Sequence, residues 1–235
     1  RLSQNTSSNK WKYEKVSDGT KRRIIRARMV IRGFKDRDKA DLDSYAGTSK
    51  KYSQRIVASV AARNGWPIGT ADISKAFLQG VTYEELHAIT GETLREVNFT
   101  LPFGEDVMSC LRQVEGFETF DPKTEVLHCD KPGTGSVDAP RAFSLKLASV
   151  TQGKCDLQPT TNDEELCLKH CRKTGKILVI MTKHVDDLKI AGESKEEIPE
   201  IMNMLGEVFG SIDVDWHGFT NCGVRHIQNP KDMSV

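Results

Sequence analysis

Two adjacent aspartates at a short turn constrain this chain more than any other feature. Residues 177–181 form a continuous apolar run, and residues 188–191 form a second short strand candidate that ends at Gly192. Asp186 and Asp187 lie between them, so we expect a hairpin with both carboxylates at its tip. Crowded carboxylates repel one another, and a divalent cation that prefers oxygen ligands stabilises such a pair best. Because the 235 residues include 17 aspartates, a solvated turn remains the alternative for this pair taken alone.

A third aspartate, Asp72, ends another apolar strand candidate, residues 68–73. One carboxylate from this strand and two from a neighbouring hairpin would hold a pair of Mg²⁺ ions. Two metal ions about 3.5–4 Å apart stabilise the attacking and leaving oxygens of an in-line phosphoryl transfer. The sequence alone leaves open whether the two strands are neighbours.

The charge of the chain is balanced overall but unevenly distributed. It has 34 basic and 33 acidic residues, whereas residues 1–39 hold 13 Lys or Arg against four acids and residues 193–215 hold seven acids against one lysine. A basic segment can meet a phosphate backbone or a triphosphate, and a solvated strand face is the alternative. No apolar run approaches the roughly 18–20 residues of a membrane span, so we expect no membrane partner.

The six cysteines indicate a reduced, intracellular protein rather than a disulfide scaffold. Cys167, His170 and Cys171 are the nearest approach to a metal-binding set, but a structural zinc site needs four ligands. We therefore keep a small metal-held binding module only as a minor hypothesis.

Strand and helix signals alternate irregularly, which predicts an α+β fold. We expect a disordered tail at 1–9, a hairpin turning at 17–20 and a helix at 53–63 that stops at Gly65. Asp138 and Pro140 suit the start of a second helix, and Ser194 with Glu197 forms a capping-box pattern before a third. Pro199 fits poorly inside that third helix. Further strands are expected at 97–101, 125–128, 166–168 and 177–181.

Four segments in order resemble the reverse transcriptase region of copia-type retrotransposon polyproteins. They are RARMVIRGFK at 26–35, GWPIGTADISKAFLQG at 65–80, APRAF at 139–143 and HVDDLKIAG at 184–192. The resemblance implies a reverse-transcriptase-like palm with a ferredoxin-like sheet and interleaved fingers. It assigns residues 1–50 and about 88–134 to the fingers and about 51–87 and 135–225 to the palm, in a single domain fragment with no RNase H region.

The resemblance also implies roles for individual residues. The three palm carboxylates are Asp72, Asp186 and Asp187, which would bind two Mg²⁺ ions, or Mn²⁺, with help from the Ile73 carbonyl. Residues expected to meet the incoming deoxynucleoside triphosphate are Arg28, Arg32, Phe77 and Gly135. Residues expected near the RNA or DNA template and its primer are Arg141, His184 and Gly223. For Phe77 an ordinary core position is the alternative, for Arg32 a solvated strand face, and for Gly135 a plain glycine leading into a helix.

Several positions depart from the family pattern. The family usually has tyrosine at His184, tryptophan at Phe143 and a Tyr-Gly-Leu-Lys-Gln-like run at 134–138. We expect the negative charge of Asp138 to lie close to the path of a phosphate and to weaken binding. The function expected from the resemblance is RNA-directed DNA synthesis in the cytoplasm, in a retrotransposon particle. The alternative is a diverged, catalytically silent remnant that still binds primer–template, and the oligomeric state stays open.

Overall fold

The computed structural model describes residues 2–4, 6–15, 20–101, 104–193, 196–210, 212–229 and 231–235, without the side chains of 2–15, 21, 25–29 and 213. The chain divides into two compact units. Unit 1 comprises Arg1–Ser44 and Val81–Ala139, and unit 2 comprises Tyr45–Gly80 and Pro140–Val235. Within the described residues, no helix is long and apolar enough to cross a membrane.

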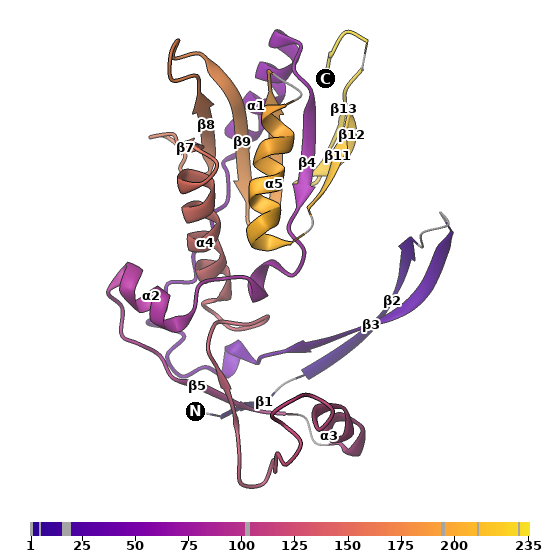
Figure 1. Ribbon diagram of the computed structural model, residues 1–235, viewed down its shortest axis with the longest axis vertical. Coiled ribbons are helices and arrows are strands. Elements are labelled where there is room, and N and C mark those ends of the chain that lie inside the picture. Colours follow the sequence, from indigo (N-terminus) through magenta and orange to yellow (C-terminus); the bar gives the residue numbers. More distant parts are fainter. Residues whose placement is uncertain are drawn as a thin grey trace. The chain divides into compact units, whose positions relative to one another are not determined.

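Unit 2 is built on a six-stranded antiparallel sheet with the strand order β11-β4-β10-β9-β8-β7 (Figure 1). Its strands are β4 (Ile68–Asp72), β7 (Gln158–Pro159), β8 (Leu166–His170), β9 (Ile177–His184), β10 (Asp187–Gly192) and β11 (Asp213–Trp216). A separate hairpin consists of β12 (Gly218–Asn221) and β13 (Val224–Ile227). The helices are α1 (Lys51–Asn64), the short η2 (Ala76–Leu78), α4 (Ala139–Gly153) and α5 (Glu197–Phe209).

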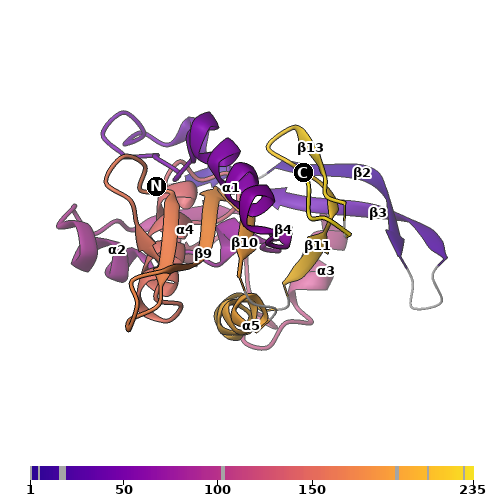
Figure 2. The same cartoon turned by 90° about the horizontal axis from the view of Figure 1, so that it is seen from above.

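The sheet of unit 2 has an apolar core on each face, because successive strand residues point to opposite sides. Figure 2 shows α1 on one side of β9, β10 and β4, and α5 on the other. On the α4/α5 side, Leu188 and Ile190 of β10 are fully buried with Phe143 of α4. On the α1 side, Ala191 of β10 packs with Val57 of α1. The two faces of β10 therefore bind different helices.

Unit 1 holds two small sheets. Strands β2 (Thr6–Lys15) and β3 (Lys21–Val30) pair as an antiparallel hairpin, and β1 (Leu2–Gln4) pairs in parallel with β5 (Val97–Thr100), which in turn pairs with β6 (Leu127–Cys129). Its helices are η1 (Gly33–Lys35), α2 (Tyr83–Thr90) and α3 (Glu105–Leu111). A capping box starts α2, in which Glu85 N–H donates to Thr82 Oγ1 and Thr82 N–H donates to Glu85 Oε2.

The predicted α+β class is confirmed, as are the helix that stops at Gly65, the helix that follows Asp138 and the 177–192 hairpin. Gly65 has φ 66°, the left-handed conformation in which glycine commonly ends a helix. The assignment of fingers and palm boundaries stays a prediction.

Two local expectations were wrong, and two helices of unit 1 were not predicted. Residues 2–4 and 6–9 lie in strands rather than in a disordered tail, because β1 pairs with β5 and β2 pairs with β3. Helices α2 and α3 were missed. Pro199 lies in the first turn of α5, where a missing N–H costs no helical hydrogen bond, so it fits better than expected. Ser194 lies outside the described residues.

Candidate active site

Two of the predicted carboxylates meet at the end of two neighbouring strands. Asp72 is the last residue of β4 and Asp187 is the first residue of β10, and the antiparallel register sets them directly opposite each other. Asp186 lies in the turn that precedes β10, and its carbonyl accepts from the Ile73 N–H at 3.4 Å. The neighbour relationship that the sequence left open is therefore established by the register.

The turn that carries Asp186 has a strained backbone. Val185 has φ 59°, a left-handed conformation that a β-branched residue rarely adopts. Its N–H donates to the Gly47 carbonyl at 2.8 Å, and Thr48 forms a β-bridge with His184. The segment at 47–49 thus holds the turn from outside the hairpin.

The carboxylates repel one another electrostatically. Partial burial raises the pKa of Asp187 above its ordinary value, the neighbouring charges of Asp186 and Asp72 raise it further, and His184 opposes the rise. A site with three carboxylates and the Ile73 carbonyl offers the oxygen ligands that Mg²⁺ prefers, so the donor chemistry fits this ion. Among the described residues, however, no three His, Cys, Asp or Glu side chains are arranged as a complete metal site. In the described part of the chain, Cys167, His170 and Cys171 likewise do not form a group of three metal ligands.

The segment that holds the turn is itself anchored by a buried aspartate, Asp163. Its Oδ2 atom accepts from the Lys50 N–H at 2.8 Å and from the Ser53 hydroxyl at 2.5 Å, so it caps α1 from 110 residues away along the chain. Its Oδ1 atom accepts from the Glu165 N–H at 3.1 Å. Burial acts to raise the pKa of Asp163, but these three hydrogen bonds outweigh it and the pKa is lowered.

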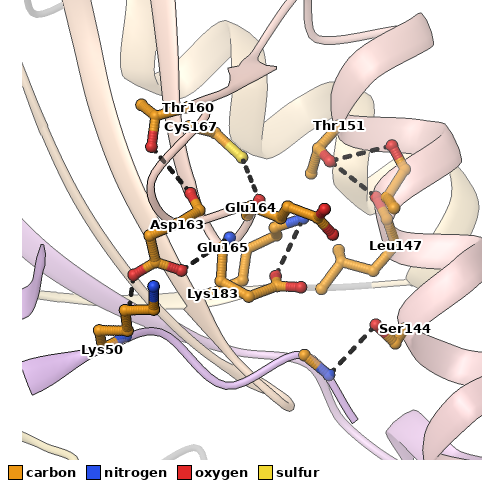
Figure 3. Close-up of polar contacts among 12 residues, drawn as sticks. Lys50, Ser144, Leu147, Thr151, Thr160, Asp163, Glu164, Glu165, Cys167 and Lys183 are labelled. Atoms are coloured by element: carbon orange, nitrogen blue, oxygen red, sulfur yellow. Dashed lines mark hydrogen bonds and ion pairs between the residues drawn. The ribbon is translucent and has the colours of Figure 1, made fainter. Parts of the chain in front are cut away.

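An ion pair lies next to this cap. Lys183 Nζ is 3.1 Å from Glu165 Oε2, and both side chains are buried. Figure 3 shows the pair between the segment that carries Lys50 and the helix that carries Ser144. The Gly47 N–H donates to Ser144 Oγ at 3.3 Å, and a side chain at Gly47 would collide with Glu165. These contacts fix the position of the Gly47 carbonyl that supports Val185.

A buried lysine, Lys189, lies two residues beyond Asp187. It is only 1% exposed, and its Nζ donates to Gln54 Oε1 at 2.9 Å and lies 3.4 Å from His226 Nε2. Burial lowers the pKa of Lys189 to about 8. Neither partner is an acid, so a charge on Lys189 is poorly compensated.

Of the remaining predicted residues of unit 2, the strand register sets His184 beside the aspartates, and the other three lie in separate elements. Phe77 lies in η2, where it is partly exposed and packs against the core under α4 and α5. His184 ends β9 directly opposite Asp187. Arg141 lies in the first turn of α4. Gly223 occupies the turn of the β12–β13 hairpin with φ 76°.

Three predicted residues belong to unit 1. Arg32 is partly buried and lines a pocket of about 470 Å³ together with Lys35, Arg95 and Ser136. Gly135 has φ 93°, and a side chain there would lie 2.3 Å from the Ile31 carbonyl oxygen, so its glycine is required by close packing rather than by helix entry alone. Arg28 lies in β3, and its side chain is outside the described part of the chain.

Sequence reasoning missed Arg95 and its pairing with Asp138. Arg95 donates to Asp138 and to Asp36, and the Asp138 side chain is only 2% exposed. Burial raises the pKa of Asp138, and the Arg95 charge opposes that rise. Asp138 is therefore a buried carboxylate paired with Arg95, and the expectation that its charge weakens phosphate binding stays a prediction.

The chain also has relatives among known proteins, although no protein-family model matches it. The "Retrovirus-related Pol polyprotein from transposon RE2" of Arabidopsis thaliana is 26% identical over 231 residues, which cover 96% of this chain and 14% of the relative. The corresponding polyprotein from transposon RE1 of the same plant is 27% identical over 209 residues, or 87% of this chain and 12% of the relative. This chain is similar to retrotransposon Pol polyproteins.

The resemblance to a retrotransposon polyprotein is thereby confirmed over most of the chain. The chain spans a small part of the length of both Pol polyproteins, so the activity that belongs to this part is a separate question.

Proposed function

We propose that this chain is the RNA-directed DNA polymerase, or reverse transcriptase, part of a copia-type retrotransposon polyprotein. The observation that carries the proposal is the register that sets Asp72 opposite Asp187, with Asp186 in the adjoining turn. The similarity to two Pol polyproteins supports a retroelement origin.

The topology of unit 2 supports a polymerase palm. The strands β4, β9, β10 and β11 occur in the spatial order β11-β4-β10-β9, and α4 and α5 connect them and pack on one face. This is the β-α-β-β-α-β arrangement of a ferredoxin-like sheet. In this interpretation unit 2 is the palm and unit 1 supplies the fingers.

In the proposed reaction, a primer 3′-hydroxyl attacks the α-phosphorus of a deoxynucleoside triphosphate and pyrophosphate leaves. Asp72 and Asp186 would hold two Mg²⁺ ions, or Mn²⁺, with Asp187 and the Ile73 carbonyl nearby. When bound, these ions stabilise charge on the attacking and leaving oxygens. The three carboxylates attract cations because a bound cation relieves the repulsion between their negative charges.

The remaining assignments follow the same proposal. Arg32 and Arg28 would meet the triphosphate, since a guanidinium fork matches phosphate oxygens, and Phe77 would lie under the sugar and disfavour a 2′-hydroxyl. Gly135 would contact template and nucleotide. The primer–template contacts would be Arg141, His184 and Gly223. We place the protein in an intracellular, cytoplasmic retrotransposon particle.

Primer extension on an RNA template, with Mg²⁺ and four deoxynucleotides, tests the proposal. We expect Asp186→Asn to abolish extension while circular dichroism and thermal unfolding stay close to those of the wild type. Asp156→Asn is the matched control, because Asp156 pairs with the exposed Arg172 and lies outside the proposed site. Unchanged extension by Asp186→Asn would refute the assignment.

Fluorescence anisotropy of a labelled primer–template duplex measures binding without synthesis. It therefore distinguishes an active polymerase from the alternative, a catalytically silent remnant that still binds the duplex. A wild type that binds the duplex but incorporates no nucleotide with Mg²⁺ or Mn²⁺ would be a silent remnant. A folded wild type that does neither would contradict both functions.

A further inference from the structure

Arg95 is the centre of a buried charge network in unit 1. Its guanidinium donates through Nη1 to Asp138 and through Nη2 to Asp36, and it lies 5.7 Å from the centre of the Tyr83 ring. The side chains of Arg95, Asp36 and Asp138 are 12%, 16% and 2% exposed. One side chain thus ties together two carboxylates and an aromatic ring that come from separate parts of the sequence.

The two carboxylates belong to segments that already touch through their backbones. Asp36 directly follows η1, which begins just after Arg32, and Asp138 ends the loop that contains Gly135. Between these segments, the Ile31 N–H donates to the Thr134 carbonyl at 2.9 Å, and the Gly33 N–H donates to the Gly135 carbonyl at 3.0 Å.

The approach of the two segments is unusually close. A Cβ on Gly33 would lie 2.2 Å from the Gly135 carbonyl oxygen. Two glycines permit this contact, and the two backbone hydrogen bonds each contribute only modestly to holding it closed. Arg95 adds charge-assisted bonds to both segments in a place screened from water, where such bonds are strong.

Arg95 also lines the pocket of about 470 Å³ that contains Arg32 and Lys35. Asp138 and Asp36 bind Nη1 and Nη2 of Arg95, so two carboxylates of the protein already neutralise the guanidinium charge. The clasped segment also contributes three cations to the pocket lining, Arg32, Lys35 and Arg37, beside the acids Asp38 and Glu96.

We propose that Arg95 is a positioning residue that clasps the Arg32 segment to the 133–137 loop and thereby sets the affinity of the pocket for a nucleoside triphosphate. This inference rests on the proposed polymerase function for its substrate. The clasp itself is a property of unit 1 and can be measured without any activity.

Hydrogen exchange of the full chain tests the clasp. Arg95→Met removes the guanidinium but keeps a long apolar side chain, and we expect exchange at the Ile31 and Gly33 amides to rise at least about tenfold, as for a local opening. Arg172→Met is the matched control, because Arg172 is 87% exposed in its pair with Asp156. Unchanged protection at Ile31 and Gly33 in Arg95→Met would overturn the clasp.

Steady-state primer extension tests the effect on nucleotide affinity. We expect Arg95→Met to raise the KM for deoxynucleotides about tenfold with kcat within about twofold, the pattern of lost binding rather than lost chemistry. Because Arg95→Met leaves Asp138 buried and unpaired, the double variant Arg95→Met/Asp138→Asn is measured beside it. We expect the double variant to recover thermal stability but to keep the high KM and the fast exchange.

The outcomes separate the two proposals. Recovery of KM as well as stability in the double variant would show that Arg95 is only a counter-ion for Asp138, and the positioning role would fall. If the wild type extends no primer while Arg95→Met still speeds exchange at Gly33, the polymerase proposal and the predicted KM effect fail and the clasp alone stands.

Discussion

Removal of the Asp163 carboxylate should loosen both α1 and the hairpin that carries Asp186 and Asp187. Asp163 accepts three hydrogen bonds, from the Lys50 and Glu165 amides and from the Ser53 hydroxyl, and it is 6% exposed. In Asp163→Ala all three donors lose their acceptor. The first turn of α1 then loses its N-cap. The segment at 47–49, which precedes α1 and contacts the strained turn at Val185, loses the anchor next to it.

The magnitude follows from the contacts. Loss of a helix N-cap costs about 0.5–2 kcal/mol, and a hydrogen bond to a charged group contributes about 1.5–3 kcal/mol. Since the Lys50 amide can partly recover water whereas the Glu165 amide is buried, we expect Asp163→Ala to lower the free energy of unfolding by about 3 kcal/mol. Asp163→Asn keeps one acceptor oxygen and should cost about 1–2 kcal/mol.

The effect of Asp163 must also depend on pH. Its folded-state pKa lies below the ordinary value of 3.8, so between these two values the unfolded chain binds more protons than the folded chain. The stabilisation by Asp163 is therefore complete above the ordinary pKa and is lost as the pH falls through the folded-state pKa. The difference between wild type and Asp163→Asn should shrink over that acidic range.

Urea unfolding followed by tryptophan fluorescence and circular dichroism, repeated from neutral to acidic pH, measures these differences. Asp41→Ala, at an exposed position, is the control and should stay within about 0.5 kcal/mol of the wild type. A double-mutant cycle with Ser53→Ala should give a coupling energy of about 1 kcal/mol for the 2.5 Å contact. A neutral Asp163→Ala, or a difference that grows toward acidic pH, would refute this account of the cap.

Two further variants probe other buried features. Lys189→Met removes the amine of a residue that is 1% exposed and whose described partners are not acids. The free energy of unfolding should therefore rise by about 1–3 kcal/mol. A loss of stability would show that the hydrogen bond to Gln54 outweighs the cost of burying the charge. Gly135→Ala places a Cβ 2.3 Å from the Ile31 carbonyl oxygen at φ 93° and should cost about 1–3 kcal/mol, whereas Gly153→Ala, at the end of α4 with no atom within 4 Å, should be neutral or slightly stabilising in the same unfolding assay.

The parts of the fold that the sequence predicted are those with a local signal. The apolar run before His184 and the pair Asp186 and Asp187 predicted the hairpin, because strand, turn and strand are contiguous. The position of Asp72 beside Asp187 had no local signal, since β4 and β10 are separated by more than 100 residues, and only the family resemblance suggested it. Helix α2 had a usable signal in Thr82 and Glu85, which was overlooked in a polar stretch.

The residues that sequence reasoning missed act through distant partners. Asp163 caps a helix 110 residues away along the chain, and Arg95 meets Asp138 across 43 residues. A lone aspartate in a polar loop or a lone arginine before a strand resembles any solvated charge until its partner is known. The interpretation of Asp138 likewise lacked its partner Arg95, because no local pattern links the two residues.

The strained turn at Val185 explains why such distant supports are needed. A two-residue turn with positive φ normally takes glycine or asparagine, whereas here the turn is Val185 and Asp186, and the Asp186 charge lies beside that of Asp187. Neither the backbone conformation nor the crowded charge is favourable by itself, so the hairpin needs stabilising contacts from outside. The Gly47 carbonyl, the Thr48 bridge and the Asp163 cap supply them from segments that the sheet and α1 hold in place. A site that gathers like charges at a sheet edge thus depends on residues that carry no chemistry of their own.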